Sequence, residues 1–492
     1  MQKEDVENNN SYNQIIKAFG LFGGVQIFNI LINMVRSKFI AVLLGASGLG
    51  IYGLLISTLG MIGSLTNLGL NSSAILSISK ASAVNDQTLI SRSIINLRRW
   101  VSFTGVLGAI ITLILASKLS QWVFGNDEYK LAFIWLSFTL FFQALSSGQS
   151  ALLQGMRKLK QLAKVSVIGS SFGLFISLSL FYFYGLRGIV PSIILTAAST
   201  LFVSWYFASK IKVENVKISM YQSFYDGLDM VKLGLSIAFT NFFGISVLYL
   251  VQVFINKTGG TEQLGLYVAS FAIINGYFGM IFTAMSTDLF PRIAAISIDN
   301  LKIKTLINQQ SIIMILILAP LLIFLISSLP FVINLLFSPK FLPIIELLKW
   351  AILGIVFQAI GYPTGLTIAA KGHSKIYLIL VIALHLTTLL TYVVFYHFLK
   401  LEGIGIAFLL VQSFFFIIGI RILQVKYSFS YEHHFIKIFL IQLVLITATF
   451  LVIMFVEIPI ANFSCVILAA ASALYSYFEL KKRIDFSSLI QR

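Results

Sequence analysis

The sequence predicts an all-α polytopic membrane protein with fourteen transmembrane helices, arranged as two pseudo-symmetric six-helix bundles around a central cleft plus two C-terminal helices. Three observations predict this class. First, 58% of the 492 residues are hydrophobic and 11% are charged, whereas soluble domains are usually about 45–50% apolar. Second, the apolar residues form stretches of the length that one bilayer crossing needs, about 20 residues. Third, short sequence elements recur at one separation, which indicates an internal duplication.

The individual helices are predicted from apolar stretches that end at turn residues or charges. The predicted ranges are 14–44, 48–70, 97–118, 131–153, 163–184, 188–208, 233–256, 264–289, 308–329, 343–369, 376–398, 403–424, 438–457 and 460–478. Gly361, Pro363 and Gly365 predict a break or bend in the tenth of these helices.

The duplication rests on three pairs of matching segments, each separated by 215 residues. LGIY at 49–52 returns as LGLY at 264–267, FQA at 142–144 returns at 357–359, and RGI at 187–189 corresponds to EGI at 402–404. Each repeat contains six helices, an even number, so both halves enter the membrane in the same orientation. We therefore expect them to be related by an axis along the membrane normal, with the working site at their interface.

The helices and loops divide the chain into five segments. These are a cytoplasmic tail at 1–13, a first bundle at 14–208, a cytoplasmic connector at 209–232, a second bundle at 233–425, and two last helices with a tail at 426–492. Most of the 35 Lys and Arg residues fall on the cytoplasmic side if both termini are cytoplasmic, as the positive-inside rule requires. The net charge of +17 therefore reflects topology and predicts no nucleic-acid partner.

Four polar residues in the first helix form one stripe. Gln26, Asn29, Asn33 and Arg36 follow spacings of 3, 4 and 3, which place them on one helix face. Such a face is expensive in lipid and should line a protein interior or a wet cavity. Arg36 lies roughly 13 Å below the turn at 45–50, near the middle of a hydrocarbon core of about 30 Å. An arginine at that depth costs about 3 kcal/mol on insertion scales.

A second interpretation ends the first helix near Val35 and lets Arg36 and Lys38 extend to the outer headgroups. The following segment, FIAVLL at 39–44, has no polar face with which to lie in an interface. This favours the buried position. Lys38 projects roughly opposite the stripe, so it reaches the same cavity only if the helix bends.

Amide side chains on five other predicted helices complete the candidate substrate contacts, although hydrogen bonding between helices explains them equally well. They are Asn67, Gln143, Asn241, Gln252, Asn275 and Gln358. Asp288 is the acid that lies clearly within a predicted helix. It has two interpretations, an ion pair with Arg292 one turn later or a site for a coupling proton or sodium ion.

No metalloprotease, phosphate-loop or nucleophile-elbow motif occurs, and the five histidines lack metal-ligand spacing. The sequence therefore predicts no catalytic residue, no metal and no cofactor. Short outer loops argue against a membrane-embedded polysaccharide polymerase or ligase. A positive charge at mid-depth argues against a multidrug exporter of organic cations and favours an anionic cargo. Both remain alternative functions.

MVRSKFIAVLLGASGLGIYG at 34–53, with the later segments LLQGMRKLKQLAKVSVIGSSFG and LFPRIAAIS, resembles Wzx-type O-antigen and oligosaccharide flippases. These belong to the multidrug/oligosaccharidyl-lipid/polysaccharide (MOP) exporter superfamily, and the resemblance covers about residues 12–425. It implies a bacterial inner-membrane carrier that flips a polyprenyl-diphosphate-linked oligosaccharide, such as an O-antigen unit of lipopolysaccharide, to the outer leaflet by alternating access. It also implies membrane lipids, a polysaccharide polymerase and a chain-length regulator as partners, and coupling to a proton or sodium gradient.

Peptidoglycan lipid-precursor flippases of the same superfamily look similar before the outer turn, with an arginine at the position of Arg36. This resemblance implies that Arg36 lines the central cleft and contacts the diphosphate. The duplicated counterpart of Arg36 is Val251, so a symmetric pair of arginines is not expected.

Overall fold

The computed structural model describes residues 2–84, 86–214 and 216–483, and these residues form helices and no strands. Eleven helical segments among them are long and apolar enough to cross a membrane, which confirms the predicted all-α membrane fold. Three of the eleven, Leu159–Ala208, Ala238–Ala295 and Ser374–Tyr427, have lengths of 50 to 58 residues. Counting each of these as two crossings gives the predicted fourteen, a number that stays a prediction.

The chain forms two compact units, one that extends to Gly265 and one that begins at Leu266. The helices of the first unit are α1 (Gln2–Leu43), α2 (Gly45–Thr66), α3 (Leu70–Ala83), α4 (Gln87–Phe124), α5 (Lys130–Gly155), α6 (Leu159–Tyr184), α7 (Ile189–Ala208) and the greater part of α8 (Met220–Ile273). A 3₁₀ turn, Gly185–Gly188, joins α6 to α7. The domain boundaries predicted from the sequence stay predictions.

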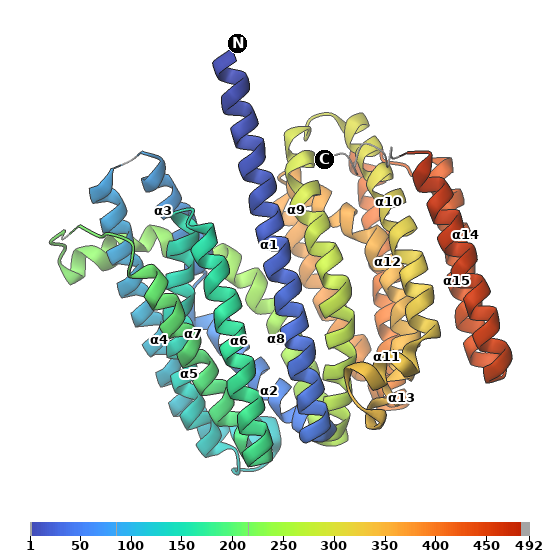
Figure 1. The fold of residues 1–492 in the computed structure, drawn as a ribbon, viewed down its shortest axis with the longest axis horizontal. Coiled ribbons are helices and arrows are strands. Elements are labelled where there is room, and N and C mark those ends of the chain that lie inside the picture. Colours follow the sequence, from blue (N-terminus) through green and yellow to red (C-terminus); the bar gives the residue numbers. More distant parts are fainter. Residues whose placement is uncertain (1, 85, 215, 484–492) are drawn as a thin grey trace. The chain divides into compact units, whose positions relative to one another are not determined.

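The first unit is a bundle in which α5 packs against α4 and α7, and α6 packs against α7 and α1 (Figure 1). The predicted second helix, 48–70, corresponds to α2, which ends earlier than predicted, at Thr66. Leu68 and Gly69 both have positive φ angles, 50° and 69°, a conformation that interrupts a helix. A Cβ atom on Gly69 would lie 2.1 Å from the carbonyl oxygen of Gly234, so this close approach requires glycine.

The second half of the predicted connector is helical, because α8 begins at Met220. This part packs on α4 through polar contacts. Ser223 donates a hydrogen bond to Asn96 (2.6 Å), and Arg99 donates one to the carbonyl oxygen of Ser219 (2.9 Å). Because most of these groups are partly or fully buried, the connector is fixed to the first unit and is not a free linker.

The helices of the second unit are the end of α8, α9 (Gly279–Ala295), α10 (Asn300–Ser327), α11 (Leu329–Leu336), α12 (Ile344–Ala370), α13 (Ser374–Tyr427), α14 (His433–Phe455) and α15 (Ile458–Lys481). A π-helical segment, Ile274–Phe278, joins α8 to α9, and a 3₁₀ turn, Pro339–Phe341, precedes α12. Within the long helices, Gly260 and Lys400 have non-helical angles, so α8 and α13 each contain two helical arms.

α12 remains helical through Pro363, so the helix is not broken there, and the predicted bend stays a prediction. Proline removes the N–H that would bond the carbonyl of Ala359. The next carbonyl, that of Ile360, accepts a hydrogen bond from the hydroxyl of Tyr431 (3.3 Å). Packing of α12 against α13 and α10 therefore holds the helix together where local preference would end it.

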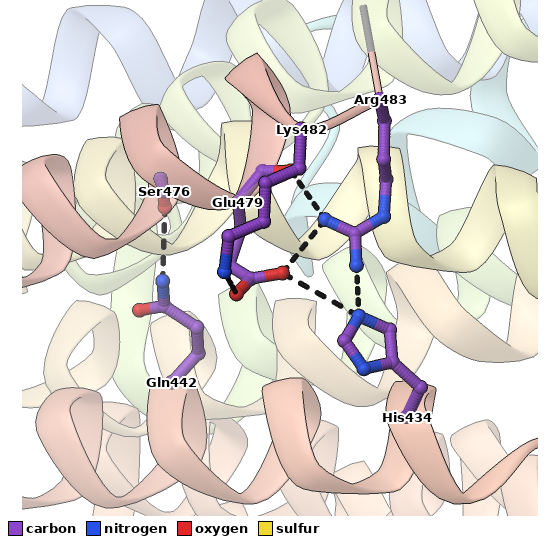
Figure 2. A network of polar contacts seen from close by, with 6 residues as sticks. All are labelled: His434, Gln442, Ser476, Glu479, Lys482 and Arg483. Atoms are coloured by element: carbon purple, nitrogen blue, oxygen red, sulfur yellow. Dashed lines mark hydrogen bonds and ion pairs between the residues drawn. The ribbon is translucent and has the colours of Figure 1, made fainter.

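The last two helices, α14 and α15, pack against each other and against α10 (Figure 1). Figure 2 shows the polar contacts that join them. Gln442 of α14 bonds Ser472 and Ser476 of α15 at 2.7 and 2.9 Å. The buried carboxylate of Glu479 accepts hydrogen bonds from Lys482 (2.8 Å) and Arg483 (2.7 Å), which follow it at the end of α15. It also lies 3.4 Å from His434 of α14. These contacts fix the register of the pair.

Candidate functional site

Two adjoining polar cavities lie inside the first unit. The larger, with a volume of about 710 Å³, is lined by α1, α2, α3, α5, α6 and α7. The smaller, of about 510 Å³, is lined by α1, α5, α6 and α7. They share Asn33, Arg36, Ser150, Thr196 and Thr200 as lining residues. The bundle therefore encloses a continuous polar region within its own helices.

The polar stripe of α1 lines this region as its spacing predicts. Gln26 and Asn29 line the smaller cavity, and Asn33 and Arg36 line both. Asn29 is fixed by a hydrogen bond from its amide to the hydroxyl of Ser166 on α6 (2.8 Å). The stripe is thus oriented by contact with α6, whereas the opposite face of α1 is apolar and exposed, as expected for a lipid-facing surface.

Among the described residues that line the two cavities, Arg36 carries a formal charge and none has a carboxylate. Its Nε atom is buried and has no hydrogen-bond partner. Its guanidinium lies against Gly173 and Thr196, since a Cβ atom on Gly173 would stand 3.1 Å from Nη2 and 2.6 Å from Cγ2 of Thr196. A guanidinium with an unused donor, in cavities whose described lining includes no carboxylate, is an anion-binding arrangement.

Lys38 and Asn67, two further predicted contacts, are not among the residues that line these cavities. Lys38 is partly buried and lies two residues after Arg36, on a different face of α1. Asn67 caps α2 through its backbone N–H, which bonds the carbonyl of Gly63, and its side-chain oxygen is buried without a partner. Asn71 of α3 lines the larger cavity instead.

The hydroxyl groups of α5, α6 and α7 were missed by sequence reasoning, although Gln143 was found. On α5, the cavity-lining residues occur at i, i+3, i+4, i+7 and i+11, which is one helix face. They are Gln143, Ser146, Ser147, Ser150 and Gln154. This periodicity is the signal that could have found them. Ser177, Ser192, Thr196 and Thr200 complete the hydroxyl lining from α6 and α7.

The candidates in α8 and in the π-helical segment are not among the residues that line the cavities of the first unit. Asn241 is exposed, and Asn275 is exposed within the segment Ile274–Phe278. Gln252 is partly buried and its side-chain oxygen has no hydrogen-bond partner. None of the three lines a cavity described here. Their roles, and the predicted cleft between the halves, stay predictions.

Asp288 forms the predicted ion pair, because its carboxylate lies 3.0 Å from the guanidinium of Arg292 one turn later. Both side chains are more than half exposed, at 58% and 53%. The pair accounts for the position of Asp288 in α9, and an ion-coupling role is left as a prediction.

Gln358 lines a separate pocket inside the second unit, with a volume of about 280 Å³. The walls are α12 and both arms of α13. The described lining has five aromatic side chains, five aliphatic side chains and two amides, and none of its residues carries a formal charge. The pocket lies near Gly361, Pro363 and Gly365, the residues that predicted a break or bend in this helix.

Fold and site together define a multi-pass membrane protein with polar residues gathered in cavities inside its first helical unit. A family model described as "Polysaccharide biosynthesis protein" matches residues 39–346. The chain belongs to this family. A comparison with curated proteins finds no significant match.

Solved structures with a similar fold come from the MOP superfamily, which the sequence resemblance predicted. The lipid II flippase MurJ in an inward closed conformation has a TM-score of 0.72 and 14% identity, covering 95% of this chain and 99% of that chain. An inward-facing multidrug resistance MATE family transporter has a TM-score of 0.68 and 17% identity, covering 81% and 94%. A MOP superfamily transporter from Pyrococcus furiosus has a TM-score of 0.60 and 18% identity, covering 84% and 96%. These three neighbours are described as a flippase and as transporters.

Proposed function

We propose that this protein flips a polyprenyl-diphosphate-linked oligosaccharide across the membrane by alternating access. The observation that carries the proposal is the charge of the cavities in the first unit. Arg36 supplies their formal charge, and amides and hydroxyls supply most of the remaining polar groups. The family's description as a polysaccharide biosynthesis protein supports a saccharide cargo, and MurJ, described as a lipid II flippase, shares the fold.

Arg36 would hold the diphosphate. A guanidinium presents donors in a planar fork that matches phosphate oxygens, and charge-assisted hydrogen bonds are roughly twice as strong as neutral ones. The unused Nε donor of Arg36 is available for such a bond. The cost of keeping the charge in the membrane, about 3 kcal/mol on insertion scales, is then offset each time the anion binds.

The first sugars would contact the neutral side chains around Arg36. Asn33, Gln143 and Ser150 offer donors and acceptors without charge, which suits sugar hydroxyls. The polyprenyl chain would remain in the bilayer beside the bundle. A cation exporter is disfavoured, because no carboxylate lines the two cavities. The Pyrococcus furiosus transporter, described as having a binding pocket of reverse polarity that suggests a different function, supports the view that pocket charge distinguishes members of this fold.

The finer parts of the proposal follow from the sequence. The cargo would be an O-antigen or similar surface-polysaccharide unit, moved from the cytoplasmic to the outer leaflet of the bacterial inner membrane. Both termini would be cytoplasmic, as the distribution of Lys and Arg supports. A polymerase and a chain-length regulator would act on the flipped unit. A proton or sodium gradient would drive transport through Asp288.

The proposal is tested in proteoliposomes that contain a polyprenyl-diphosphate-linked oligosaccharide, by measuring how fast the sugar becomes accessible to an external glycosidase. Arg36→Ala should reduce the rate about ten- to hundredfold, because each hydrogen bond to a charged group contributes about 1.5–3 kcal/mol. Arg36→Lys should retain part of the rate, since it keeps the charge and loses the fork.

Arg187 is the matched control, because it is an exposed arginine of the same unit in the turn Gly185–Gly188 and lines neither cavity. Arg187→Ala should transport at the normal rate. If Arg36→Ala and Arg187→Ala behave alike, the anion site is elsewhere. If the deletion strain accumulates flipped but unpolymerised units, the polymerase alternative replaces the flippase.

A further inference from the structure

The pocket of the second unit is the duplicated counterpart of the cavities in the first. Adding the repeat separation of 215 residues to Gln143, Ser150 and Leu162 gives Gln358, Gly365 and Tyr377, all of which line the pocket. Most other lining residues of the pocket are related to the first-unit cavities in the same way. Each half of the molecule has therefore kept an enclosed space at the same place in its own helices.

The chemistry of the two spaces differs. Where the first unit has Ser147 and Thr200, the second has Tyr362 and Phe415. No residue with a formal charge lines the second pocket. Gln358 is an exception to this change, because its counterpart in the first repeat, Gln143, is also a glutamine. The duplication has thus preserved a cavity and an amide while replacing hydroxyl groups by aromatic rings.

We propose, on the basis of the proposed function, that this pocket binds one uncharged sugar ring of the lipid-linked oligosaccharide. A pyranose has apolar C–H faces that lie on aromatic rings and a rim of hydroxyl groups that bond amides. Phe357 and Phe416, with ring centroids 5.9 Å apart, provide such aromatic surface. Gln358 and Gln412 provide donors and acceptors.

The amides favour a sugar over an apolar ligand as the occupant of this pocket. The side-chain oxygen of Gln358 is buried and has no hydrogen-bond partner, and buried polar atoms normally have one. A hydroxyl donor from a sugar would satisfy it, whereas a lipid chain or an aromatic compound without hydroxyl groups would leave it unpaired. The volume of about 280 Å³ lies at the small end of ligand pockets, which are roughly 300–1,000 Å³, and so favours one ring over an extended chain.

Gly365 provides a means of filling the pocket without disturbing the helix. A Cβ atom built on Gly365 has no neighbour within 4 Å, so the side chain of Gly365→Leu would extend into empty space. Gly60→Leu on α2 is the control, because a Cβ atom on Gly60 also has no neighbour within 4 Å and Gly60 lines neither the pocket nor the two cavities. The two variants add the same side chain to a glycine with open space around it, one inside the pocket and one outside it.

The experiment is saturation-transfer difference NMR on the purified full-length protein with free N-acetylglucosamine and galactose at millimolar concentration. Wild-type protein should transfer saturation to the ring protons of at least one sugar. Gly365→Leu should reduce this signal at least fivefold, and Gly60→Leu should leave it within about twofold. Gln358→Leu should also reduce the sugar signal while retaining binding of indole, an aromatic probe without hydroxyl groups.

Binding of geranylgeranyl diphosphate, measured on the same samples, separates this inference from the proposed function and confirms folding. It should depend on Arg36 and persist in Gly365→Leu. The inference is overturned if neither sugar binds, if Gly60→Leu and Gly365→Leu reduce the sugar signal equally, or if Gln358→Leu binds sugar normally. Loss of diphosphate dependence on Arg36 with intact sugar binding would overturn the proposed function alone.

Discussion

The guanidinium of Arg36 on α1 lies against the backbone of Gly173 on α6, so closely that a Cβ atom at residue 173 would stand 3.1 Å from Nη2. The same Cβ would lie 2.6 Å from Cγ2 of Thr196 on α7. The absence of a side chain at this one position therefore allows three helices to converge around the charge. This relationship makes Gly173 a probe of the site that leaves Arg36 itself unchanged.

Gly173→Val should displace Arg36 and Thr196 and reduce the affinity for geranylgeranyl diphosphate at least tenfold, because contacts below 3.0 Å force neighbouring atoms to move and overpacking typically costs about 1–3 kcal/mol. Isothermal titration calorimetry in detergent measures the affinity. Gly60→Val on α2 is the control, since its Cβ would have open space. Equal affinities for the two variants would show that the guanidinium position is unimportant.

The polar stripe of α1 could be predicted from the sequence, because the spacing of its four residues places them on one helix face. Polar residues are costly to expose to lipid, so that face must lie against protein or a cavity. The hydroxyls of α6 and α7 could not be predicted in the same way. Thr200 donates to the carbonyl of Thr196 (2.8 Å) and Ser170 to that of Val167 (3.1 Å), so each is satisfied within its own helix. The sequence pattern around such a residue is the same whether its hydroxyl group faces a cavity or a neighbouring helix.

Two features of the fold depend on contacts between distant segments, which local sequence patterns do not contain. The break between α2 and α3 falls at Leu68 and Gly69, where the chain approaches Gly234, and neither residue type requires a break. The continuity of α12 through Pro363 depends on packing against α13 and α10. Local preference is overruled by tertiary packing in both places.

The register between α14 and α15 should depend on Glu479. Glu479→Ala leaves Lys482, Arg483 and His434 without their common carboxylate. We expect destabilisation of about 3 kcal/mol, the lower end of the range for breaking a buried pair, because Lys482 and His434 are more than half exposed. The melting temperature in detergent measures this effect.

Asp229→Ala is the matched control for Glu479→Ala. Asp229 pairs with Lys232 at 3.9 Å, and both side chains are exposed, at 91% and 75%. An exposed pair of this kind contributes about 0–1 kcal/mol, so the melting temperature should change little. A large loss of stability in Asp229→Ala, equal to that of Glu479→Ala, would mean that burial of Glu479 is not the cause.

The stability of the folded protein should depend on pH through Asp299. Its carboxylate caps α10 by accepting hydrogen bonds from the backbone of Leu301 (3.0 Å) and Lys302 (3.1 Å). The backbone hydrogen bond from Lys302 is the main cause that lowers the pKa of Asp299. Since the folded-state pKa is below the unfolded value of about 3.9, the cap stabilises the fold above that value and the contribution is lost as the pH falls through the folded pKa.

Wild-type protein should therefore melt at a higher temperature than Asp299→Ala at neutral pH, and the difference should shrink below about pH 4. Differential scanning fluorimetry across the pH range measures both curves. Asp299→Asn is a useful second variant, because asparagine also caps helices and does not titrate. A difference between wild type and Asp299→Ala that stays constant down to the lowest pH would show that the charge of Asp299 has no part in capping.

We propose that Asp288 binds a coupling ion in spite of its ion pair with Arg292. Both side chains are more than half exposed, and exposed pairs contribute about 0–1 kcal/mol, so the pair holds the carboxylate only weakly. Asp288→Asn should abolish the stimulation of transport by an imposed gradient, whereas Arg292→Gln should retain it within about threefold, because only the first variant removes the negatively charged carboxylate. Proteoliposomes with an imposed proton or sodium gradient, compared with the same vesicles after an ionophore, measure the stimulation. If the two variants respond equally, Asp288 serves only to pair with Arg292, and the gradient must couple through another residue.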